Sequence, residues 1–409
     1  MAKKDNIIVG LDIGTTKVCA IVGEKTKDGA EIIGIGSSPS KGLRKGVVVN
    51  IESTVEAIKK AVAEAELMAG CEINRVYCGI AGSHIKAFNS HGVIAIKGKE
   101  IAQADVDRVI EATQTVLIPS DREVIHVIPQ EFIVDDQEGI QQPVGMIGNR
   151  LEVRVHIVTA AITSAQNIVK CANKAGLDVA DIALQQIASS EAVLNPDERE
   201  IGAALVDIGG GTTDIAIYQN GAIKYTTVIP LGGNQITNDI SVGLRTSVAE
   251  AENLKKKWGC AFTSMVSKDD NIEVPNVDGS KSRTITKYML SEIIEPRVEE
   301  MFELVRREML KSGYENLVSS GIVLTGGTAS MEGITDLGEQ IFNLPVRRGQ
   351  PGNITGLVDM VKSPMYATAV GLVHYGGKHM TEIQFQKGNE GNILNKLGIR
   401  MKDFMKEFF

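Results

Sequence analysis

The sequence has no apolar run approaching the roughly 20 residues that a membrane-spanning helix needs. It begins MAKKDN and passes directly into a strand-like stretch, without the apolar core of a signal peptide. Cysteine is sparse, and its five residues are scattered along the chain: Cys19, Cys71, Cys78, Cys171 and Cys260. An odd count without a Cys-x-x-Cys pair argues against a disulfide scaffold and indicates a reducing compartment.

Positive charge and clustered metal ligands are also lacking. The chain has 43 Lys and Arg against 51 Asp and Glu, for a formal net charge of -8, which argues against a nucleic-acid-binding body. Its six histidines are dispersed, so a zinc site is not expected. What is present is ordinary globular composition, 43% hydrophobic and 23% charged. A length of 409 residues predicts two or more domains.

The first elements are clear from their patterns. Residues 7–13 (IIVGLDI) predict a buried strand, Gly14–Lys17 a turn, and 18–23 a returning strand. Asn50 is a suitable cap and Gly70 a suitable stop for a helix between them. Its apolar stripe has helical spacing, at Ile51, Val55, Ile58 and Val62. A further strand is expected at Arg75–Ile80.

Residues 83–163 differ in texture from the rest. Short alternating runs precede a helix expected at 102–116, and two long strands are expected at 123–135 and 151–160. This predicts a small α+β module inserted in a larger α/β domain, with sheets that have one wet face. The elements beyond it are expected in this order: a helix at 164–175, a strand at 179–188, strands and a hairpin over 203–229, a mostly helical region at 246–313 with polar loops at 265–285, a strand from 321 and a linker at 376–391.

An internal repeat links the two halves of the chain. GLDIGTTKVCAIVG near the start and LVDIGGGTTDIAIY at 205 each place an apolar strand before Asp-Ile-Gly and a Thr-Thr pair. Asp12 would correspond to Asp207, and Thr15–Thr16 to Thr212–Thr213. Because each copy opens a half of similar α/β texture, the match favours a duplication.

The repeat carries chemistry suited to phosphates. Glycine turns present backbone N–H groups closely, threonine hydroxyls add donors, and Lys17 adds a positive charge. Asp12 and Asp207, at the strand ends, suit a hydrated Mg²⁺. Each hairpin alone could be an ordinary glycine turn, but the matched pair favours a clamp on a triphosphate. A third turn, Gly326–Ser330, suits close approach to a nucleoside only in company with the other two.

These three motifs, in this order, resemble the phosphate 1, phosphate 2 and adenosine motifs of the actin, heat-shock chaperone and sugar-kinase superfamily. Residues 185–194 (QQIASSEAVL) and 365–373 (MYATAVGLV) resemble its two connecting segments. The resemblance implies an α/β, actin-like two-lobed ATPase fold with ATP in the cleft between the lobes.

Within the superfamily, the chain most resembles the FtsA family of cell division proteins, from residue 7 to the carboxyl end. VDIGGGTTDIAIYQNGAI, TTVIPLGGNQITNDI, GIVLTGGTASMEGI and ATAVGLVHYG carry this resemblance, as does the place of the insert. It implies an inserted α+β subdomain (1C) and a C-terminal amphipathic helix. The implied domains are 1A at 1–82 and 164–200, 1C at 83–163, 2A at 201–242 and 316–375, 2B at 243–315, a linker at 376–391 and a membrane-targeting helix at 392–409.

The resemblance also implies roles for single residues, with ATP and Mg²⁺ as cofactors. Phosphates would be held from one side by Gly14, Thr15, Thr16 and Lys17, and from the other by Gly209, Gly210, Gly211, Thr212 and Thr213. Asp12 and Asp207 would order Mg²⁺ and its waters. Glu252 and Lys255 would contact ribose and adenine, unless they are a solvated helix face, and Gly326, Gly327 and Thr328 would bound the nucleoside. Gln185, Gln186 and Glu191 could orient the attacking water; Glu191 is favoured, and weak or slow ATPase activity is expected at most.

The last segment, 392–409 (NILNKLGIRMKDFMKEFF), has an apolar stripe at helical spacing and two more basic than acidic side chains. Its apolar positions are Ile393, Leu394, Leu397, Met401, Phe404, Met405 and Phe408. Such a helix is too short and polar to span a bilayer but is suited to lie on an anionic membrane. The alternative is a terminal helix docked on the protein's own core.

The FtsA resemblance implies an ATP-binding protein that self-polymerises and anchors FtsZ filaments to the inner face of the membrane at the division septum. The FtsZ C-terminal peptide would bind subdomain 2B, with Arg297 a candidate beside Arg283 and Lys287, and later division proteins would bind 1C. One alternative is another membrane-linked actin relative of the PilM or MreB type. A metabolite kinase is the other, but it needs a carboxylate base and residues 185–194 contain no Asp.

Overall fold

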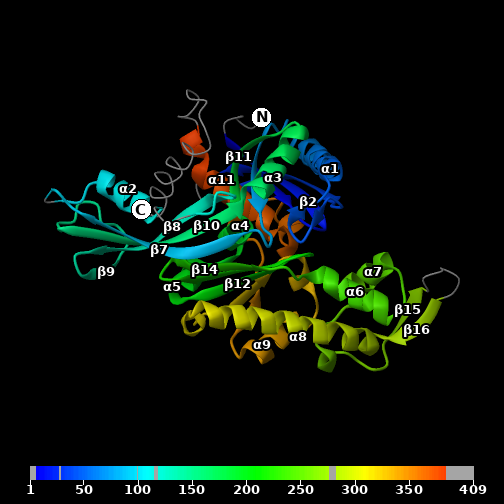
Figure 1. Ribbon diagram of the computed structural model, residues 1–409. Coiled ribbons are helices and arrows are strands. Elements are labelled where there is room, and N and C mark those ends of the chain that lie inside the picture. The colour runs from blue at the N-terminus through cyan, green and yellow to red at the C-terminus, as the bar shows by residue number, and fades with distance from the viewer. Residues whose placement is uncertain (1–5, 27–28, 99, 115–117, 276–281, 384–409) are drawn as a thin grey trace.

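The computed structural model describes residues 6–26, 29–98, 100–114, 118–275 and 282–383. Two α/β lobes lie one above the other, and a smaller unit projects from the first lobe (Figure 1). The expected α/β class is confirmed, and the two lobes and the projecting unit each have a hydrophobic core cluster of their own. In the described part of the chain, no helix is long and apolar enough to cross a bilayer.

Both lobes share a plan of five strands, to which the first sheet adds a sixth, β19, at one edge. In each sheet a central strand is antiparallel to the strand that follows it and parallel to a third strand on its other side. The sheet orders are β11-β6-β1-β2-β3-β19 and β14-β13-β12-β17-β18. The first sheet comprises β1 Ile7–Ile13, β2 Lys17–Lys25, β3 Ala30–Pro39, β6 Arg75–Ile80, β11 Asp178–Leu184 and β19 Ile354–Gly356. The second comprises β12 Ala203–Ile208, β13 Thr213–Gln219, β14 Ala222–Ile229, β17 Ile322–Thr325 and β18 Val346–Arg348. The repeat in the sequence is therefore also a repeat of structure.

Helix α1 (Ile51–Ala69) shows why the local predictions succeed. The Asn50 side chain accepts a hydrogen bond from the Ser53 N–H, and Gly70 ends the helix in the left-handed conformation at φ 64°. Its apolar stripe is buried against the first sheet, so cap, stop and burial all agree. Helices α3 (Ile162–Lys174), α9 (Ile334–Phe342) and α10 (Val358–Val361) complete the lobes, together with the two-residue strands β4 (Leu43–Arg44) and β5 (Val47–Val48).

Two helices, α4 (Gln185–Val193) and α11 (Ala367–Ile383), pack against each other between the sheets. The short helix α5 (Pro196–Ile201) follows α4 along the chain. A Cβ at Gly371 would meet the Ala188 carbonyl and lie 3.1 Å from the Ser189 nitrogen, so their backbones touch. The strand expected over 179–188 ends at Leu184, because residues 185–188 belong to α4.

Helix α11 also corrects the expected linker. Residues 376–383 continue the helix, and 384–391 lie outside the described residues, as does the tail at 392–409. Gly376 belongs to the helix because it packs closely: a Cβ there would lie 2.6 Å from both Ile8 and the ring of Tyr77. The glycines at this point serve contact with β1 and β6 rather than freedom of the chain.

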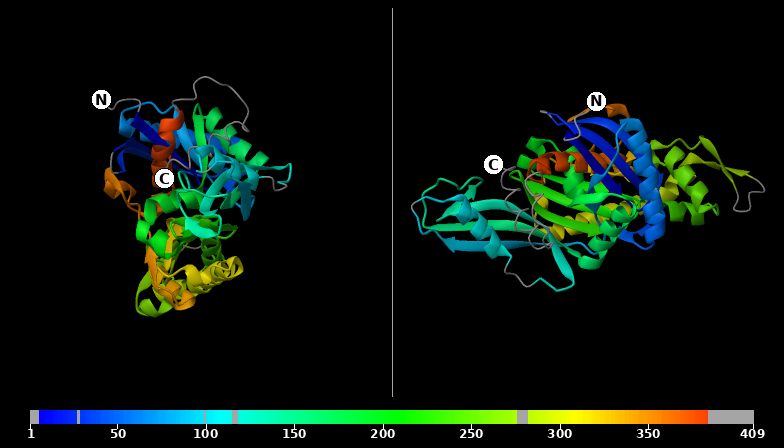
Figure 2. Two further views of the ribbon diagram at one scale, coloured as in Figure 1. Left: turned by 90° about the vertical axis from the view of Figure 1, so that its left-hand side faces the viewer. Right: turned by 90° about the horizontal axis from the view of Figure 1, so that it is seen from above.

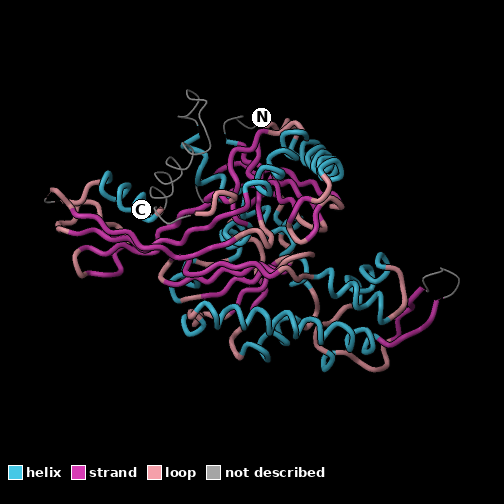
Figure 3. Tube along the Cα trace, in the orientation of Figure 1, coloured by secondary structure: helices cyan, strands magenta, loops and turns pink. Residues whose placement is uncertain are grey.

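The insert is a four-stranded antiparallel sheet covered on one face by α2 (Gln103–Thr113). Its strands are β7 Lys86–Ala95, β8 Arg122–Val134, β9 Gln137–Ile140 and β10 Arg150–Ala161. The two longest strands run continuously from the body into the projecting sheet (Figure 3). Ile125 and Val158 belong to the core of the first lobe, whereas Phe132 and Val153, on the same strands, belong to the core of the insert. The insert is thus joined to the body through shared sheet strands.

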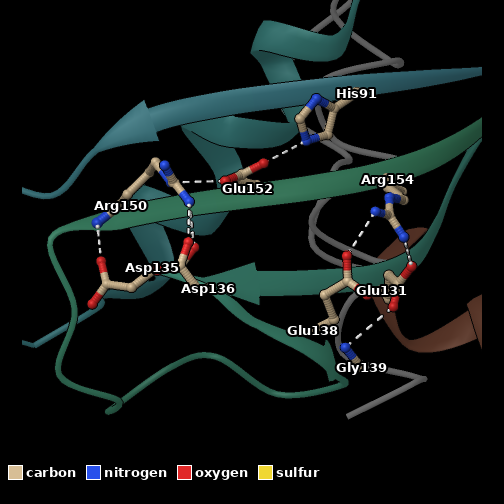
Figure 4. Close-up of polar contacts among 9 residues, drawn as sticks. All are labelled: His91, Glu131, Asp135, Asp136, Glu138, Gly139, Arg150, Glu152 and Arg154. Carbon is tan, nitrogen blue, oxygen red and sulfur yellow. Dashed lines mark hydrogen bonds and ion pairs between the residues drawn. The ribbon is translucent and has the colours of Figure 1, made fainter.

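The other face of this sheet is charged, as its alternation predicts (Figure 4). Arg154 bridges Glu131 at 2.6 Å and Glu138 at 2.9 Å, and Glu152 meets both Arg150 and His91 at 2.7 Å. Such cross-strand pairs support the sheet by a few tenths of a kcal/mol to about 1 kcal/mol each and keep this face wet.

At the opposite end of the molecule from the insert, the second lobe carries α6 (Gly233–Gly243), α7 (Val248–Trp258) and a β-hairpin (Figures 1 and 2). The hairpin, β15 Asn271–Pro275 with β16 Ser282–Thr286, lies where polar loops were expected. Ile272, Val274 and Ile285 give the hairpin a buried side. Its buried residues therefore alternate with exposed ones, as in a strand, although its composition is polar. The long helix α8 (Lys287–Ser312) then returns beneath the second sheet.

Candidate functional site

The two acidic hairpins have the same geometry. The Gly14 N–H donates to the Lys17 carbonyl at 2.9 Å, and the Gly209 N–H donates to the Thr212 carbonyl at 2.9 Å. Counting from these turns, Thr15 and Thr16 correspond to Gly210 and Gly211. The expected correspondence of the two Thr-Thr pairs is therefore wrong by two positions. Equivalent positions in the two hairpins are set by the geometry of their turns and do not carry the same residue types.

The tips of the two hairpins touch across the space between the lobes. A Cβ added at Gly210 would collide with the Thr16 side chain, and one at Gly211 would lie 2.7 Å from Thr15 Oγ1. Only glycine permits this approach, which explains why the second hairpin has glycines where the first has threonines. The contact brings the acidic strand ends of both lobes to the wall of one cavity.

This cavity has a volume of about 640 Å³, within the usual range for small-molecule sites. It collects nearly all of the predicted site residues, from five separate segments of the chain. Those at its wall are Asp12, Gly14, Thr15, Thr16, Lys17, Gln185, Asp207, Gly209, Gly210, Gly211, Thr212, Glu252, Lys255, Gly326, Gly327 and Thr328.

Two predicted residues are not at the wall. The Thr213 hydroxyl donates to the Leu231 carbonyl at 2.9 Å, so its role is structural. Glu191 faces a separate small cavity, where Arg199 bridges it at 2.8 Å and Lys378 at 2.6 Å. Burial alone would raise the pKa of Glu191, but these two cations lower it to about 2. The expectation that Glu191 orients an attacking water is corrected: it holds α4, α5 and α11 together.

Gln185 is the connecting-segment residue that reaches the site. Its side-chain amide donates to Asp12 Oδ1 at 3.0 Å. Gln186, next along the helix, is buried and donates weakly to the Thr227 carbonyl at 3.5 Å. Of the three polar residues considered in this segment, Gln185 alone lines the cavity.

Three buried carboxylates give the cavity floor its electrostatic character. Asp12, Asp207 and Asp214 are 8%, 7% and 3% exposed. Burial raises the pKa of Asp12 to about 6, against the lowering effect of Lys17 and with a further contribution from Asp207. Burial and then the charge of Asp207 raise the pKa of Asp214 well above its usual range. Such a cluster is costly without a cation.

Asp214 is a site residue that the sequence reasoning missed. It lies across the β12–β13 ladder from Asp207, and its Oδ1 has no hydrogen-bond partner in the described structure. The signal was a carboxylate in an otherwise apolar strand, directly after the Thr-Thr pair. Because a buried orphan carboxylate oxygen is unusual, it supports the fit of a cation here.

The same acids suit a hydrated cation rather than a bare one. Among the described residues, no three His, Cys, Asp or Glu side chains converge tightly enough to hold a metal ion by themselves. Mg²⁺ keeps several waters and takes one or two carboxylates together with phosphate oxygens. The donor set therefore fits Mg²⁺ carried in by a phosphate-bearing ligand.

The second-lobe side of the cavity is already organised by hydrogen bonds. Lys255 bridges Glu252 at 2.7 Å and donates to the Gly233 carbonyl at 3.0 Å. Thr328 Oγ1 donates to the Gly209 carbonyl at 3.3 Å, which ties the third glycine turn to the second hairpin. Glu252 and Lys255, both on α7, therefore form a fixed wall of the cavity and not a solvated helix face.

Comparisons with known proteins point in one direction. A family model described as "Cell division protein FtsA" matches residues 204–371, and one described as "SHS2 domain inserted in FTSA" matches residues 82–159. The cell division protein FtsA of Pseudomonas aeruginosa is 52% identical over 371 residues, covering 90% of this chain and 89% of that protein.

Solved structures of low identity share the fold. A chain of a "PilM-PilN type IV pilus biogenesis complex" superposes with a TM-score of 0.66 at 15% identity, covering 90% of this chain and 98% of its own. MreB5 of Spiroplasma citri bound to ADP superposes with a TM-score of 0.54 at 15% identity, covering 93% of this chain and 99% of its own. The architecture is therefore that of actin-like proteins.

Proposed function

The chain belongs to the FtsA family of cell division proteins, and from this premise we propose that it binds ATP with Mg²⁺ between its lobes, assembles into filaments and anchors FtsZ filaments to the membrane. The observation that supports the first part best is the pair of mirrored acidic hairpins around one cavity. The ADP of the MreB5 relative is consistent with a nucleotide in this fold.

In this proposal the residues of the cavity divide the nucleotide between them. The backbone N–H groups of 15–16 and 210–212 would hold phosphates, since those of Gly14 and Gly209 already close the two turns. Asp12 and Asp207 would orient the waters of Mg²⁺, which supplies charge neutralisation when bound. The wall formed by Glu252 and Lys255 faces the ribose, and 326–328 bound the nucleoside. Gln185 would orient the attacking water, a role supported by its position at the cavity wall, and turnover is expected to be slow.

Binding is tested by thermal or denaturant unfolding with and without Mg²⁺ and ATP. A ligand at 100 times its Kd stabilises the native state by about 2.7 kcal/mol, so the unaltered chain should show a clear shift. Asp207→Asn should weaken Mg²⁺–ATP binding about tenfold or more, as loss of a metal-site partner does. Asp181→Asn is the matched control, because Asp181 is equally buried but bonds Tyr375 outside the cavity. An unaltered chain that ATP and Mg²⁺ fail to stabilise would overturn the proposal.

Membrane anchoring is proposed for residues 392–409 on their sequence pattern. The full chain should sediment with vesicles that contain anionic lipid, and a chain ending at Gly391 should stay in the supernatant. Phe404→Asp interrupts the apolar stripe without shortening the chain, so it should also reduce sedimentation. Equal sedimentation of all three chains would show that the tail is docked elsewhere or unused. The proposed location is the cytoplasmic face of the membrane at the division septum.

FtsZ binding is proposed for the outer part of the second lobe, residues 243–315. Arg297, on α8, already bonds Asp239 at 2.5 and 3.1 Å and also contacts Glu300, so a carboxylate of the FtsZ peptide would compete with these partners. Arg283 and Lys287 are likewise engaged, with the Leu244 carbonyl and with Glu332. Later division proteins are proposed to bind the insert.

Charge reversal tests the Arg297 assignment. Arg297→Glu should lower affinity for an FtsZ C-terminal peptide several-fold, because it removes a donor and opposes the acidic groups of the peptide. Arg306→Glu is the control on the same helix, since Arg306 pairs with Glu303 at 3.2 Å and its side chain is half exposed. Unchanged peptide affinity in Arg297→Glu would remove this residue from the proposed surface.

A further inference from the structure

The carboxylate of Asp207 is held from behind by two hydroxyl groups. Ser189 Oγ donates to Asp207 Oδ2 at 2.6 Å, and Thr368 Oγ1 donates to the same oxygen at 3.3 Å. The two hydroxyl oxygens are also 3.0 Å apart, so the three groups form a closed triangle. A hydroxyl–carboxylate bond as short as the first is of the strong, charge-assisted kind.

These hydroxyls come from the two helices that run between the sheets. Ser189 lies in the middle of α4 and is fully buried, and Thr368 lies in the first turn of α11. The helices touch backbone to backbone at Gly371, beside Ser189, so neither hydroxyl can withdraw without moving a helix. Asp207 itself stands on β12, in the second lobe.

Helix α4 serves both acidic strand ends. Gln185 donates to Asp12 Oδ1 in the first lobe, and Ser189, four residues later, donates to Asp207 in the second. Residues four apart lie on one face of a helix, about one turn from each other. A single rigid turn therefore connects Asp12 to Asp207 and sets how far apart the two acids stand.

The second oxygen of Asp207 is left for the cavity. Oδ1 lies beside Gly326, where a Cβ would collide with it, and both residues are at the cavity wall. With Oδ2 fixed by hydroxyls, the carboxylate cannot rotate to exchange its oxygens. An octahedral Mg²⁺ shell is demanding in geometry, so such fixing favours it.

We propose that Ser189 and Thr368 are positioning residues that fix the orientation of Asp207, and with Gln185 its distance from Asp12, for a magnesium-bound nucleotide. This inference rests on the proposed nucleotide function. It differs from a merely structural role, in which the hydroxyls only satisfy a buried carboxylate. A structural role would affect stability, whereas a positioning role affects how strongly Mg²⁺ improves nucleotide binding.

The experiment measures the dissociation constant of ADP for the full chain, once with Mg²⁺ and once with EDTA. The value in EDTA divided by the value in Mg²⁺ is the Mg²⁺ ratio. Ser189→Ala should lower this ratio about tenfold, the lower end of the range for partners of metal ligands, while affinity in EDTA stays near that of the unaltered chain. Thr368→Val should lower it less, since its bond is longer, and Thr368→Ser should restore it.

Ser190→Ala is the matched control. Ser190 is the next residue on α4 and is equally buried, but its hydroxyl bonds the Ile187 carbonyl and Tyr218, away from the cavity. It should reduce stability as Ser189→Ala does and leave the Mg²⁺ ratio unchanged. If Ser189→Ala does not fold, Thr368→Val against Thr368→Ser decides the question alone.

The possible failures are distinct. If the unaltered chain binds ADP in neither condition, the proposed function falls and this inference falls with it. If the unaltered chain depends on Mg²⁺ and both hydroxyl-deleting variants keep the full ratio, only the positioning role is overturned. The same holds if Thr368→Ser behaves as Thr368→Val, or if Ser190→Ala lowers the ratio as much as Ser189→Ala.

Discussion

Glu191 and Gln185 stand on the same short helix, and their side chains meet very different surroundings. Gln185 reaches Asp12 at the cavity, whereas Glu191 is enclosed by Arg199 and Lys378 from two other helices. A carboxylate so paired, with a pKa of about 2, is unsuited to accept a proton from water near neutral pH. Its contribution is to stability, which is present above pH 4.5 and is lost as the pH falls toward 2.

Substitutions at these two positions should therefore separate stability from nucleotide turnover. Glu191→Gln leaves two cations without their counter-charge and should lower the free energy of unfolding by about 3 kcal/mol, with little effect on ADP affinity. Gln185→Ala should leave unfolding nearly unchanged and reduce ATP turnover. Urea unfolding and a phosphate-release assay on both variants check this. Loss of turnover without loss of stability in Glu191→Gln would restore Glu191 as the water-orienting residue.

Among the elements, the two glycine-rich hairpins depend most closely on one another. Gly210 and Thr16 belong to different lobes, and a methyl group on the glycine would meet the threonine Cγ2 first. The lobes can close to this degree only because one partner has no side chain. We expect overpacking here to act on the cleft and to leave the cores of both lobes intact.

Gly210→Ala should accordingly weaken Mg²⁺–ADP binding by about 1 to 2 kcal/mol, roughly tenfold, while unfolding of the nucleotide-free chain changes little. Thr16→Ser removes the colliding Cγ2 and keeps the hydroxyl, so the double variant should recover much of the affinity. A double-mutant cycle measures this coupling. Gly98→Ala controls for the substitution itself, because a Cβ there meets nothing closer than 3.6 Å. Purely additive effects would mean that the hairpins do not press on each other.

The elements that the sequence could predict are those whose local signals agree with their burial. β1 and β6 are found at their predicted bounds, and α1 begins and ends at the predicted cap and stop. Helix α4 escaped because it is buried on nearly every side and shows no amphipathic period. The β15–β16 hairpin escaped because its polar residues hide a buried side of few apolar residues.

The residues of the cavity could be predicted only where a sequence motif marks them. Asp12 and Asp207 stand out because a duplicated motif marks the same place in both lobes. Asp214, Ser189 and Thr368 belong to no repeat, and their meeting depends on how β13, α4 and α11 pack. Contacts of this kind, formed between residues up to 179 positions apart, leave no local pattern.

At the scale of the whole molecule, the insert contacts both lobes although the chain enters and leaves it from the first. The edge strand β14 of the second lobe packs against β7 and β8 of the insert. Gln130 donates to the Ile223 carbonyl at 2.7 Å, and Asn89 donates to the Lys224 carbonyl at 3.2 Å. Relative movement of the lobes must therefore move the insert or break these bonds.

His156 lies at the centre of this junction. It is 1% exposed, and its ring nitrogens meet Asn89 Oδ1 at 2.7 Å and Thr226 Oγ1 at 2.8 Å. With the amide oxygen of Asn89 accepting from Nδ1, Nε2 is left to accept from the Thr226 hydroxyl, so the neutral ring satisfies both partners. A proton on Nε2 would remove that acceptor. Burial lowers the pKa of His156 to about 4.

The insert–lobe junction should consequently weaken in mild acid. The unfolded chain takes up a proton near pH 6.5 and the native His156 only near pH 4, so the stability it contributes is full above pH 6.5 and declines as the pH falls between these values. From pH 7 to pH 5 this amounts to about 2 kcal/mol. The pKa of His84 is also lowered to about 4, and the raised pKa of Asp12 acts on stability in the opposite direction. Both groups contribute equally to the unaltered chain and to a His156 variant, so their effects on the free energy of unfolding cancel when the two chains are compared.

His156→Gln provides that comparison, since a side-chain amide also offers both a donor group and an acceptor but does not titrate. Urea unfolding of both chains at pH 7 and pH 5 should show the unaltered chain losing about 2 kcal/mol more than the variant. Hydrogen exchange of the Ile223 to Thr227 amides should rise at pH 5, after correction for intrinsic rates, in the unaltered chain only. Because only a buried, neutral His156 creates the difference, equal losses in the two chains would mean that the ring is charged or hydrated in the native junction.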